Sequence, residues 1–381
     1  MARSRSEPPL ALRAVCTPGL ERVLAAELHT LNITPRDAEP GSLSWPGTAE
    51  QMQRTNLWLR TASRITVQLG SFHARAFGEL ERRARELPWE RFVARGQALR
   101  FRVTCRKSRL YHTAGVAERV GAAVAAHVGD EPPAVPEAQG EDDGDDAQLI
   151  IVRLLHDRCT VSVDSSGALL HRRGYRLATA KAPMRETLAA AMLLASGWDA
   201  RAPLLDPFCG AGTIPIEGAL LARRIAPGAR RTFAFQRWPA FDASDWQRLV
   251  HDAREGERLV APCPILGSDR DAGAVRAAAA NAERAGVAAD VAFSRLALSA
   301  ISPPPGPGWL VTNPPYGVRV GDRRALRDLY AQLGNVWRAR CPGWKLVLLS
   351  ADPRLAAALG APLETIAETR NGGIDVRIVT A

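Results

Sequence analysis

Residues 311–321, VTNPPYGVRVG, constrain the fold of this chain more than any other stretch. The apolar run 309–311 stops at Asn313, and Pro314 and Pro315 cannot donate the backbone hydrogen bonds that a sheet ladder needs. The pattern therefore predicts a buried strand that delivers a rigid loop at its C-terminal end. In doubly wound α/β sheets, ligands bind at that edge of the sheet.

The chemistry of this loop suits a planar amine. Such an amine on a nucleobase is a poor nucleophile because its lone pair is delocalised into the ring. The side-chain oxygen of Asn313 and the backbone carbonyl of Pro314 would accept both amine hydrogens and favour the pyramidal geometry of attack, while Tyr316 would stack on the base. Pro315 would stiffen the loop. Taken alone, the same four residues also fit an ordinary turn.

A second motif, PLLDPFCGAGTIPIEGALLA, reads as a strand over residues 203–206, a glycine turn and a helix. Gly210 and Gly212 let backbone amides approach a ligand closely, and the helix N-terminus offers unpaired N–H groups. The sequence ILGSDRD repeats this logic, with a strand that ends at Asp269, whose carboxylate can bind both hydroxyls of a ribose. A lone glycine turn is weak support for a nucleotide site, but strand, acid, turn and helix in this order are much stronger.

The remaining C-terminal pattern alternates strands with helices and predicts a parallel sheet. We expect helices over 272–285 and 323–340, strands over 289–293 and 344–350, and a closing hairpin over 363–368 and 374–380. The insertion 223–262 is rich in aromatic residues, which could wall a base pocket, although packing in a small satellite core is favoured. These aromatic residues are Phe233, Phe235, Trp238, Phe241 and Trp246.

The N-terminal half reads as an α+β region. Its predicted elements are a strand over 10–16, a helix over 19–31, a strand ending at 69, a helix over 74–87, a strand over 99–105, a helix over 112–127, and a hairpin over 149–155 and 159–163. Residues 130–147 hold eight acidic residues with several Pro and Gly, so we expect an exposed flexible insertion.

The net charge of +10 favours a polyanionic partner, because the acidic insertion leaves the rest of the chain more basic still. Arg106, Lys107 and Arg109 follow a predicted strand and would contact phosphate. The alternatives are an arginine-rich solvated surface and a solvated strand end.

Several classes of protein do not fit this sequence. No apolar stretch approaches the length of a membrane span, and the first residues lack the apolar core of a signal peptide, so we expect a cytoplasmic protein. The six cysteines form no CxxC pair, which argues against a zinc site or a disulfide framework. We expect no metal and favour a monomer.

Two families resemble this chain. CTPGLERVLAAEL and LIIVRLLHDRCTVSVDSSG resemble an N-terminal ferredoxin-like segment followed by a THUMP RNA-binding domain. DPFCGAGT, GSDRD, TNPPYG and the stretch from HRRGYR to ETLAA resemble class I adenosylmethionine-dependent methyltransferases, closely those THUMP-bearing RNA enzymes that methylate the N2 amine of guanine. The resemblance implies a ferredoxin-like segment at 1–55, a THUMP domain at 56–166, a linker and leading helix at 167–200, and a Rossmann-like methyltransferase domain at 201–381.

The resemblance also implies S-adenosylmethionine as cofactor and assigns residues to it. The cofactor residues would be Asp206, Pro207, Phe208, Gly210, Gly212, Thr213, Asp269 and Asn313. The basic linker would add RNA contacts at Arg172, Arg173 and Arg176. One position departs from the family: Ala297 stands where an acid usually meets the adenine amine, and Ser294 or Ser299 would have to substitute.

Three rival functions stay open at this point. The same loop serves adenine amines in DNA and a glutamine amide in protein, and an RNA-binding assembly factor without catalysis would share the N-terminal half. Methylation of a ring carbon would need a cysteine beside the base, and Cys263 stands before the second strand rather than after the fourth. Within RNA, large-subunit ribosomal RNA is favoured over transfer RNA.

Overall fold

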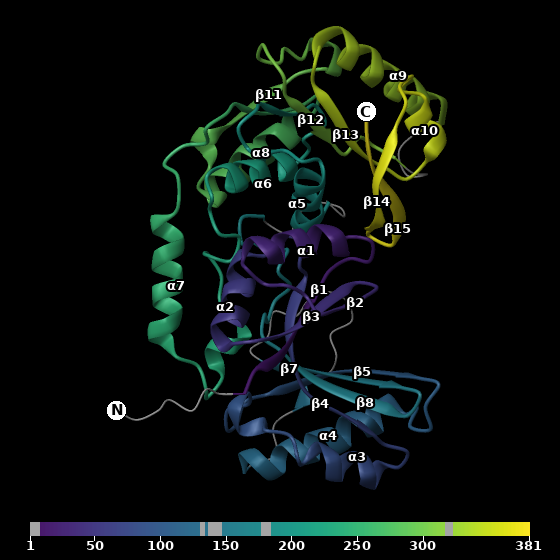
Figure 1. Cartoon of the computed structure of the whole chain (residues 1–381). Coiled ribbons are helices and arrows are strands. Elements are labelled where there is room, and N and C mark those ends of the chain that lie inside the picture. Colours follow the sequence, from purple (N-terminus) through teal and green to yellow (C-terminus); the bar gives the residue numbers. More distant parts are fainter. Residues whose placement is uncertain (1–7, 130–133, 136–146, 177–183, 317–322) are drawn as a thin grey trace.

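The computed structural model describes residues 8–129, 134–135, 147–176, 184–316 and 323–381. Within them, one sheet forms in each half of the chain, and the two halves pack along the long axis of the molecule (Figure 1). Most of the acidic insertion and residues 317–321 of the predicted loop lie outside the described residues. In the described part of the chain, no helix is long and apolar enough to cross a membrane.

The N-terminal sheet has the strand order β2-β3-β1-β4-β8-β7-β5-β6. Its strands are β1 (Leu10–Val15), β2 (Asp37–Glu39), β3 (Ser42–Gly47), β4 (Arg64–His73), β5 (Leu99–Arg106), β6 (Ala134–Val135), β7 (Gln148–Leu155) and β8 (Arg158–Asp164). Its helices are α1 (Glu21–Thr30), α2 (Ala49–Trp58), α3 (Phe77–Ala84) and α4 (Thr113–Val128). Because β4 pairs with β1 on one side and β8 on the other, the two N-terminal units share one sheet. The boundary expected at residue 55 lies inside α2.

Strands β2 and β3 were missed by the sequence analysis. β2 is short and its three residues are exposed, so it shows no apolar alternation. In β3, Leu43 and Trp45 alternate with serines, but Pro46 is unfavourable inside a strand and obscured this signal. Elsewhere alternation predicts the sheet well. In β8, for example, Cys159, Val161 and Val163 are buried, whereas Thr160 and Ser162 lie on the opposite face. The residue pattern thus leaves one face of this sheet polar.

The C-terminal sheet has the order β11-β10-β9-β12-β13-β15-β14, and its strands are parallel except for β15, which runs antiparallel to both of its neighbours, β13 and β14. Its strands are β9 (Leu204–Asp206), β10 (Ile265–Asp269), β11 (Val291–Arg295), β12 (Trp309–Thr312), β13 (Lys345–Ser350), β14 (Glu364–Asn371) and β15 (Ile374–Thr380). Its helices are α5 (Glu186–Ala195), α6 (Thr213–Ala222), α7 (Ala243–Glu255), α8 (Ala272–Ala285), α9 (Arg323–Arg340) and α10 (Pro353–Ala357). This order confirms the predicted Rossmann-like fold, with its topological switch point between β9 and β12.

The aromatic insertion packs between the two halves instead of lining a pocket. The rings of Phe233 and Phe235 stack with centroids 5.3 Å apart, and both meet Trp246 edge-on. Trp238 packs edge-on against Phe92 of the N-terminal half at 4.9 Å. The packing interpretation is therefore confirmed, although these side chains belong to the continuous core and do not form a separate satellite.

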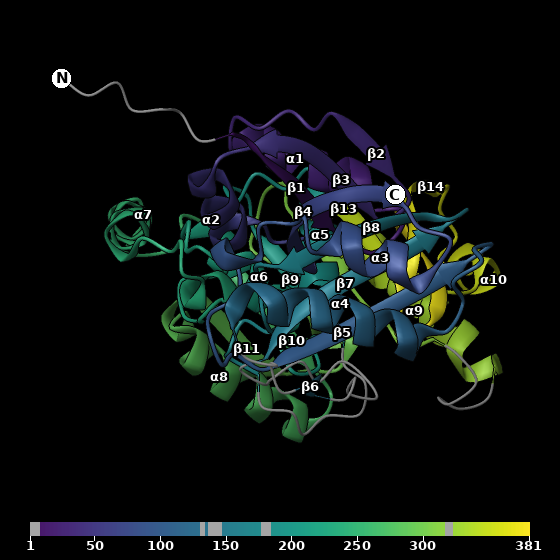
Figure 2. The ribbon, with the colours of Figure 1, turned by 90° about the horizontal axis from the view of Figure 1, so that it is seen from below.

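The views from two directions agree on this arrangement. Helix α7 lies beside α2 in Figure 1 and in Figure 2, so a helix of the C-terminal half covers the N-terminal half. The N-terminus of α7 is capped by Asp242, whose carboxylate accepts the backbone N–H of Ser244 at 2.8 Å. The insertion therefore fixes the relative position of the two sheets.

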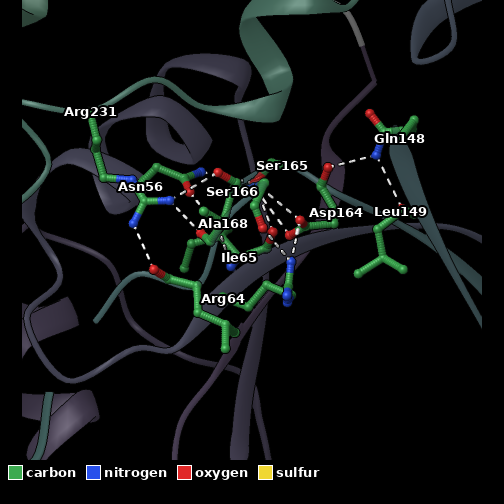
Figure 3. Close-up of polar contacts among 12 residues, drawn as sticks. Asn56, Arg64, Ile65, Gln148, Leu149, Asp164, Ser165, Ser166, Ala168 and Arg231 are labelled. Atoms are coloured by element: carbon green, nitrogen blue, oxygen red, sulfur yellow. Dashed lines mark hydrogen bonds and ion pairs between the residues drawn. The ribbon is translucent and has the colours of Figure 1, made fainter. Parts of the chain in front are cut away.

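Beside this aromatic cluster lies a buried polar junction (Figure 3). Arg64 of β4 forms an ion pair with Asp164 at the end of β8, and both side chains are almost completely buried. Asp164 also accepts the backbone N–H groups of Ser166 at 3.1 Å and Gly167 at 2.8 Å. Arg231 of the insertion donates to the carbonyls that follow, including Leu169 O at 2.8 Å. This junction holds the chain where it leaves the N-terminal sheet.

Removing Asp164 is expected to destabilise the protein strongly. Asp164→Ala would leave the Arg64 guanidinium buried without its carboxylate, which costs about 3–5 kcal/mol of the free energy of unfolding. Urea denaturation of the full chain measures this cost. The control is Glu86→Ala, which breaks an exposed ion pair of 3.0 Å with Arg83 and should change stability by less than about 1 kcal/mol. Equal losses in the two variants would contradict a special role for the buried pair.

Candidate active site

Three polar residues of the predicted site meet at the carboxyl edge of the C-terminal sheet. Asp206 ends β9, Asp269 ends β10, and Asn313 follows β12 directly. β9 is hydrogen-bonded to β10 on one side and to β12 on the other. The parallel register therefore brings together residues that lie more than a hundred positions apart in the sequence.

Asp206 is buried at the centre of this edge. One of its carboxylate oxygens, Oδ1, accepts the hydroxyl of Thr312 at 2.6 Å and the backbone N–H of Phe208 at 3.0 Å. Burial raises the pKa of Asp206 to about 7, against the opposing effect of these two hydrogen bonds, and the nearby charge of Asp269 adds to the rise. The contact with Thr312 ties the strand of the NPPY loop to the strand of the glycine turn.

The glycine turn is held against β10. The carboxylate of Asp269 accepts the backbone N–H of Gly210 at 3.1 Å through one oxygen and that of Asp271 at 2.9 Å through the other. Gly210 and Gly212 have φ of +50° and +82°, the left-handed region that favours glycine. A Cβ at Gly212 would also lie 2.9 Å from the side chain of Ala278. Each Asp269 oxygen keeps a lone pair for a further donor, such as a ribose hydroxyl.

Helix α6 begins at Thr213 with Gly212 as its N-cap, so no side chain caps its first N–H groups. Such an end suits the carboxylate of a ligand, since it presents unpaired donors and the positive end of the helix dipole. The predicted cofactor residues Pro207 and Phe208 lie in the same turn, between Asp206 and the glycines. These features fit an adenosylmethionine group.

Two linker arginines predicted to contact RNA point inward instead. Arg173 is buried and donates to the carbonyls of Leu170 and Arg60 at 2.5 Å each, with Glu217 of α6 3.7 Å from its Nε. Because RNA cannot reach a buried guanidinium that is already paired, this prediction is wrong for Arg173.

Arg176 needs the same correction. Its guanidinium donates to Thr213 Oγ1 at 2.7 Å and to Met184 O at 2.9 Å, and Glu186 of α5 lies 3.4 Å from its Nε. It therefore braces the start of α6, beside the glycine turn. Arg172 is half-buried and has partners of its own, and its RNA contact stays a prediction.

The sequence analysis also missed the acidic partners of these arginines. Glu186 and Glu217 are buried, and Tyr175 donates its hydroxyl to Glu217 Oε1 at 3.1 Å. Burial raises the pKa of Glu186 to about 7. Their one sequence signal was an acidic residue inside an otherwise apolar helix pattern, ETLAA in α5 and PIEGALL in α6.

Asn313 carries the clearest sign of an incomplete site. Its side-chain oxygen Oδ1 is buried and has no hydrogen-bond partner among the described residues. Buried acceptors are nearly always paired in folded proteins, so this oxygen is available to a donor that the described residues do not supply. Pro314 is buried and Pro315 half-buried, which keeps the backbone of the loop fixed.

Tyr316 is half-buried at the end of the described loop. Its hydroxyl accepts a hydrogen bond of 2.7 Å from Nδ2 of Asn371, the last residue of β14 before the turn to β15. Burial raises the pKa of Tyr316, and the bond from Asn371 opposes that rise. Asn-Gly-Gly predicts a turn at residues 371–373 but not which loop that turn will meet, so the contact with Tyr316 was not predicted.

The remaining predicted contacts lie at the surface. Ala297, Ser294 and Ser299 are exposed after and along β11, so the structure offers no acid at the predicted adenine position. Arg106 and Lys107 are exposed at the end of β5, as phosphate contacts require. No group of three or more His, Cys, Asp or Glu in the described ranges could hold a metal ion.

The exposed cluster at the end of β5 is anchored to the neighbouring hairpin. The backbone N–H of Arg109 donates to Asp157 Oδ1 at 2.7 Å, and that of His156 donates to Arg106 O at 3.2 Å. Arg75 also lies beside Asp157, at 3.1 Å. The bond from Arg109 and the charge of Arg75 lower the pKa of Asp157. Arg109 itself is exposed.

Because the pKa of Asp206 is raised, the contribution of this residue to the stability of the folded protein should depend on pH. Since the folded state favours the neutral carboxyl, the contribution of this group to stability is full below its unfolded pKa and lost as the pH rises to about 7. Asp206→Asn keeps an Oδ1 acceptor but cannot ionise. The variant should therefore gain stability over the wild type, and by more at pH 8 than at pH 5, in denaturant unfolding. A gain that does not change between these pH values would contradict the raised pKa.

Three family models match this chain. The model of the RMKL-like methyltransferase domain matches residues 173–379, that of the RlmL ferredoxin-like domain matches residues 11–66, and that of the THUMP domain matches residues 74–164. Together they cover both halves of the fold. The predicted combination of ferredoxin-like, THUMP and methyltransferase domains is thereby confirmed.

Similar curated proteins carry related names. "Putative RNA methyltransferase slr0064" of Synechocystis is 33% identical over 93% of this chain and 92% of its own length. "Ribosomal RNA large subunit methyltransferase K/L" of Syntrophotalea carbinolica is 35% identical over 98% of this chain but only 53% of its own length. The chain thus spans about half the length of that K/L relative.

A solved structure is similar over the whole fold. SMU.472, described as "a putative methyltransferase complexed with SAH", shares 30% identity and a TM-score of 0.86, with 98% of each chain covered. SAH is what adenosylmethionine becomes when it loses its methyl group. This neighbour therefore confirms the predicted cofactor, S-adenosylmethionine.

Proposed function

Because the chain belongs to the family of RMKL-like methyltransferases, we propose that it methylates RNA, at the exocyclic N2 amine of a guanosine. The observation that carries this proposal is the buried, unpaired side-chain oxygen of Asn313 at the carboxyl edge of the sheet. An exocyclic amine would supply the donor that this oxygen lacks. The bound cofactor would supply a methyl group already activated on a sulfonium.

The residues of the chain would act mainly by positioning. Asn313 Oδ1 and the carbonyl of Pro314 would accept the two amine hydrogens, which leaves the nitrogen lone pair free to attack. The bond from Thr312 to Asp206 fixes these acceptors relative to the glycine turn that would hold the cofactor. No nucleophile from the enzyme is needed, so the rate enhancement would come from orientation.

Methylation of a ring carbon is disfavoured by the cysteines. Cys263 is buried just before β10, and burial raises its pKa to about 11. Cys209, which lies in the glycine turn, is also buried, and its pKa is raised further. Because thiolates rather than thiols attack, neither residue suits covalent catalysis on a base.

RNA is proposed as the substrate on the basis of the N-terminal half. A groove of about 600 Å³ crosses the polar face of its sheet, and five arginines are among its lining residues: Arg13, Arg64, Arg102, Arg153 and Arg158. Arg64 is buried and paired with Asp164, so the other four would contact phosphate. Glu39 offsets part of this charge, at 2.7 Å from Arg13 and 3.8 Å from Arg153. The excess of positive charge, continued by the cluster at Arg106 and Lys107, suits a phosphate backbone.

Large-subunit ribosomal RNA is the favoured target, and transfer RNA is the alternative. The name of the K/L relative supports the first, although the chain spans only half of that protein. A catalytically inert assembly factor is disfavoured, because Asp206, Asp269 and Asn313 are all present and meet at one edge of the sheet.

Removing two arginines from the groove should weaken RNA binding. Arg153→Ala/Arg158→Ala would delete two phosphate contacts, so affinity should fall and the slope of log K against log salt should shrink by about 1 per contact. Fluorescence anisotropy with fragmented ribosomal RNA over a salt series measures both quantities. The control, Arg82→Ala/Arg83→Ala on α3, removes equal charge outside the groove. Equal changes in the two variants would show that charge alone matters.

Substitutions of Asn313 and Asp269 should affect catalysis and cofactor binding separately. Asn313→Ala should abolish methyl transfer and leave adenosylmethionine affinity nearly intact, because it removes an acceptor for the amine. Asp269→Ala should chiefly weaken that affinity in calorimetry, because it removes the ribose ligand and frees the turn at Gly210. Turnover of Asn313→Ala close to that of the wild type would refute the mechanism.

Nucleoside mass spectrometry tests the target. Ribosomal and transfer RNA, separated from cells with and without this gene, should differ by loss of N2-methylguanosine from the ribosomal pool. Loss from the transfer RNA pool would select the alternative substrate. Unchanged N2-methylguanosine in both pools would instead favour methylation of DNA amines or protein amides, or a role in binding alone.

A further inference from the structure

The C-terminal hairpin β14–β15 overhangs the catalytic edge. The last residue of β13, Ser350, pairs with Arg377 of β15, so the turn around residues 371–373 extends beyond the carboxyl end of β13. A groove of about 910 Å³ lies along the hairpin. This groove leaves part of the hairpin without packing. The position of its tip, around residues 371–373, therefore depends on a few specific contacts.

The tip of the hairpin contacts the proposed catalytic loop. Asn371, the last residue of β14, donates its side-chain N–H to the hydroxyl of Tyr316 at 2.7 Å. Both residues are half-buried. The bond fixes the far end of the ring that would stack on the target base.

The same face of this strand is also held by the ferredoxin-like unit. Thr369 donates its hydroxyl to the carbonyl of Pro18 at 2.9 Å. Gly19 lies so close to β14 that a Cβ on it would come within 1.6 Å of Glu368 O. Figure 1 shows the hairpin reaching down to the chain just before α1. Thr369 and Asn371 are two residues apart and therefore share one face of the strand.

The loop that holds the hairpin is itself rigid. The carboxylate of Glu21 accepts the backbone N–H of Gly19 at 2.9 Å and that of Gly41 at 2.6 Å. Burial opposes ionisation of Glu21, but these bonds lower its pKa overall. The loop at Pro18 and Gly19 is therefore a rigid contact for β14.

We propose that Asn371 is a positioning residue that orients Tyr316, and that the loop at Pro18 and Gly19 sets Asn371 through the hairpin. The proposal rests on the proposed function, because it assigns Tyr316 to the target base. If so, the N-terminal unit that would bind RNA also helps to orient the target base, although none of its residues touches a reacting atom.

The first experiment reads the contact without any methyl transfer. The chain has four tyrosines, so ring-¹³C-tyrosine labelling gives few resonances, and Tyr316→Phe identifies that of Tyr316. Asn371→Ala and Gly19→Ala should both shift it. The matched control is Gly96→Ala, a glycine that also has positive φ, +71°, but has nothing within 4 Å of an added Cβ. A shift that is absent in Gly19→Ala, or equal in Gly96→Ala, would overturn the link from the loop.

The second experiment reads the consequence. With ribosomal RNA from cells that lack the gene as substrate, Asn371→Ala should lower kcat about three- to tenfold and leave the Kd for adenosylmethionine unchanged. Tyr316→Phe/Asn371→Ala should be no slower than Tyr316→Phe alone, because the two residues act through one bond. Additive losses, or an unchanged kcat in Asn371→Ala, would overturn the positioning role.

The two experiments keep the proposals apart. If the wild type methylates no RNA, the proposed function fails and the orienting role of Asn371 fails with it, while the tyrosine resonances still decide whether Gly19 reaches Tyr316. If methylation is normal and the resonances do not respond, the inference fails and the proposed function stands.

Discussion

The hydrogen bond from Thr312 to Asp206 is the constraint on which the site depends. It joins β12, which presents Asn313, to β9, which starts the glycine turn. The register of a parallel sheet places these strand ends side by side, but only a side-chain contact fixes the loop on one relative to the turn on the other. The bond is short and buried, and it offsets part of the cost of enclosing a carboxylate. Distances across the site are thus set by the sheet and this single bond.

A buried polar network extends the same logic to the interface between the two halves. Arg60, which follows α2, donates to Ile225 O at 2.7 Å, accepts Arg173 at its carbonyl, and has its backbone N–H bound by Glu27 of α1. Arg173 in turn approaches Glu217 of α6. Helix α6 starts at the glycine turn, so contacts from the N-terminal half reach the helix that begins there. Buried ion pairs are weak evidence for stability, but their strict geometry favours one relative placement of the halves.

The sequence predicted those parts of the site that follow a strong apolar run. Asp206, Asp269 and Asn313 each end such a run, and strand ends of a parallel sheet converge, so their meeting could be inferred. Arg173 and Arg176 were misplaced because a run of arginines looks the same whether it faces RNA or a buried glutamate; their partners stand elsewhere in the chain. Strand β2 is short and exposed, and β3 contains a proline. Asn371 meets Tyr316 only through the three-dimensional path of the hairpin. Pairings that arise from tertiary packing leave no local pattern.

The unpaired oxygen of Asn313 shows how stability and function oppose each other here. A buried acceptor without a donor costs free energy that packing elsewhere must offset, about 1–3 kcal/mol. Pro314 is buried and has a fixed φ, which restricts the backbone of the loop next to Asn313. A flexible loop would satisfy this oxygen with solvent and lose the preorganised acceptor. The rigidity of the NPPY segment is therefore the condition under which an unsatisfied group can serve binding.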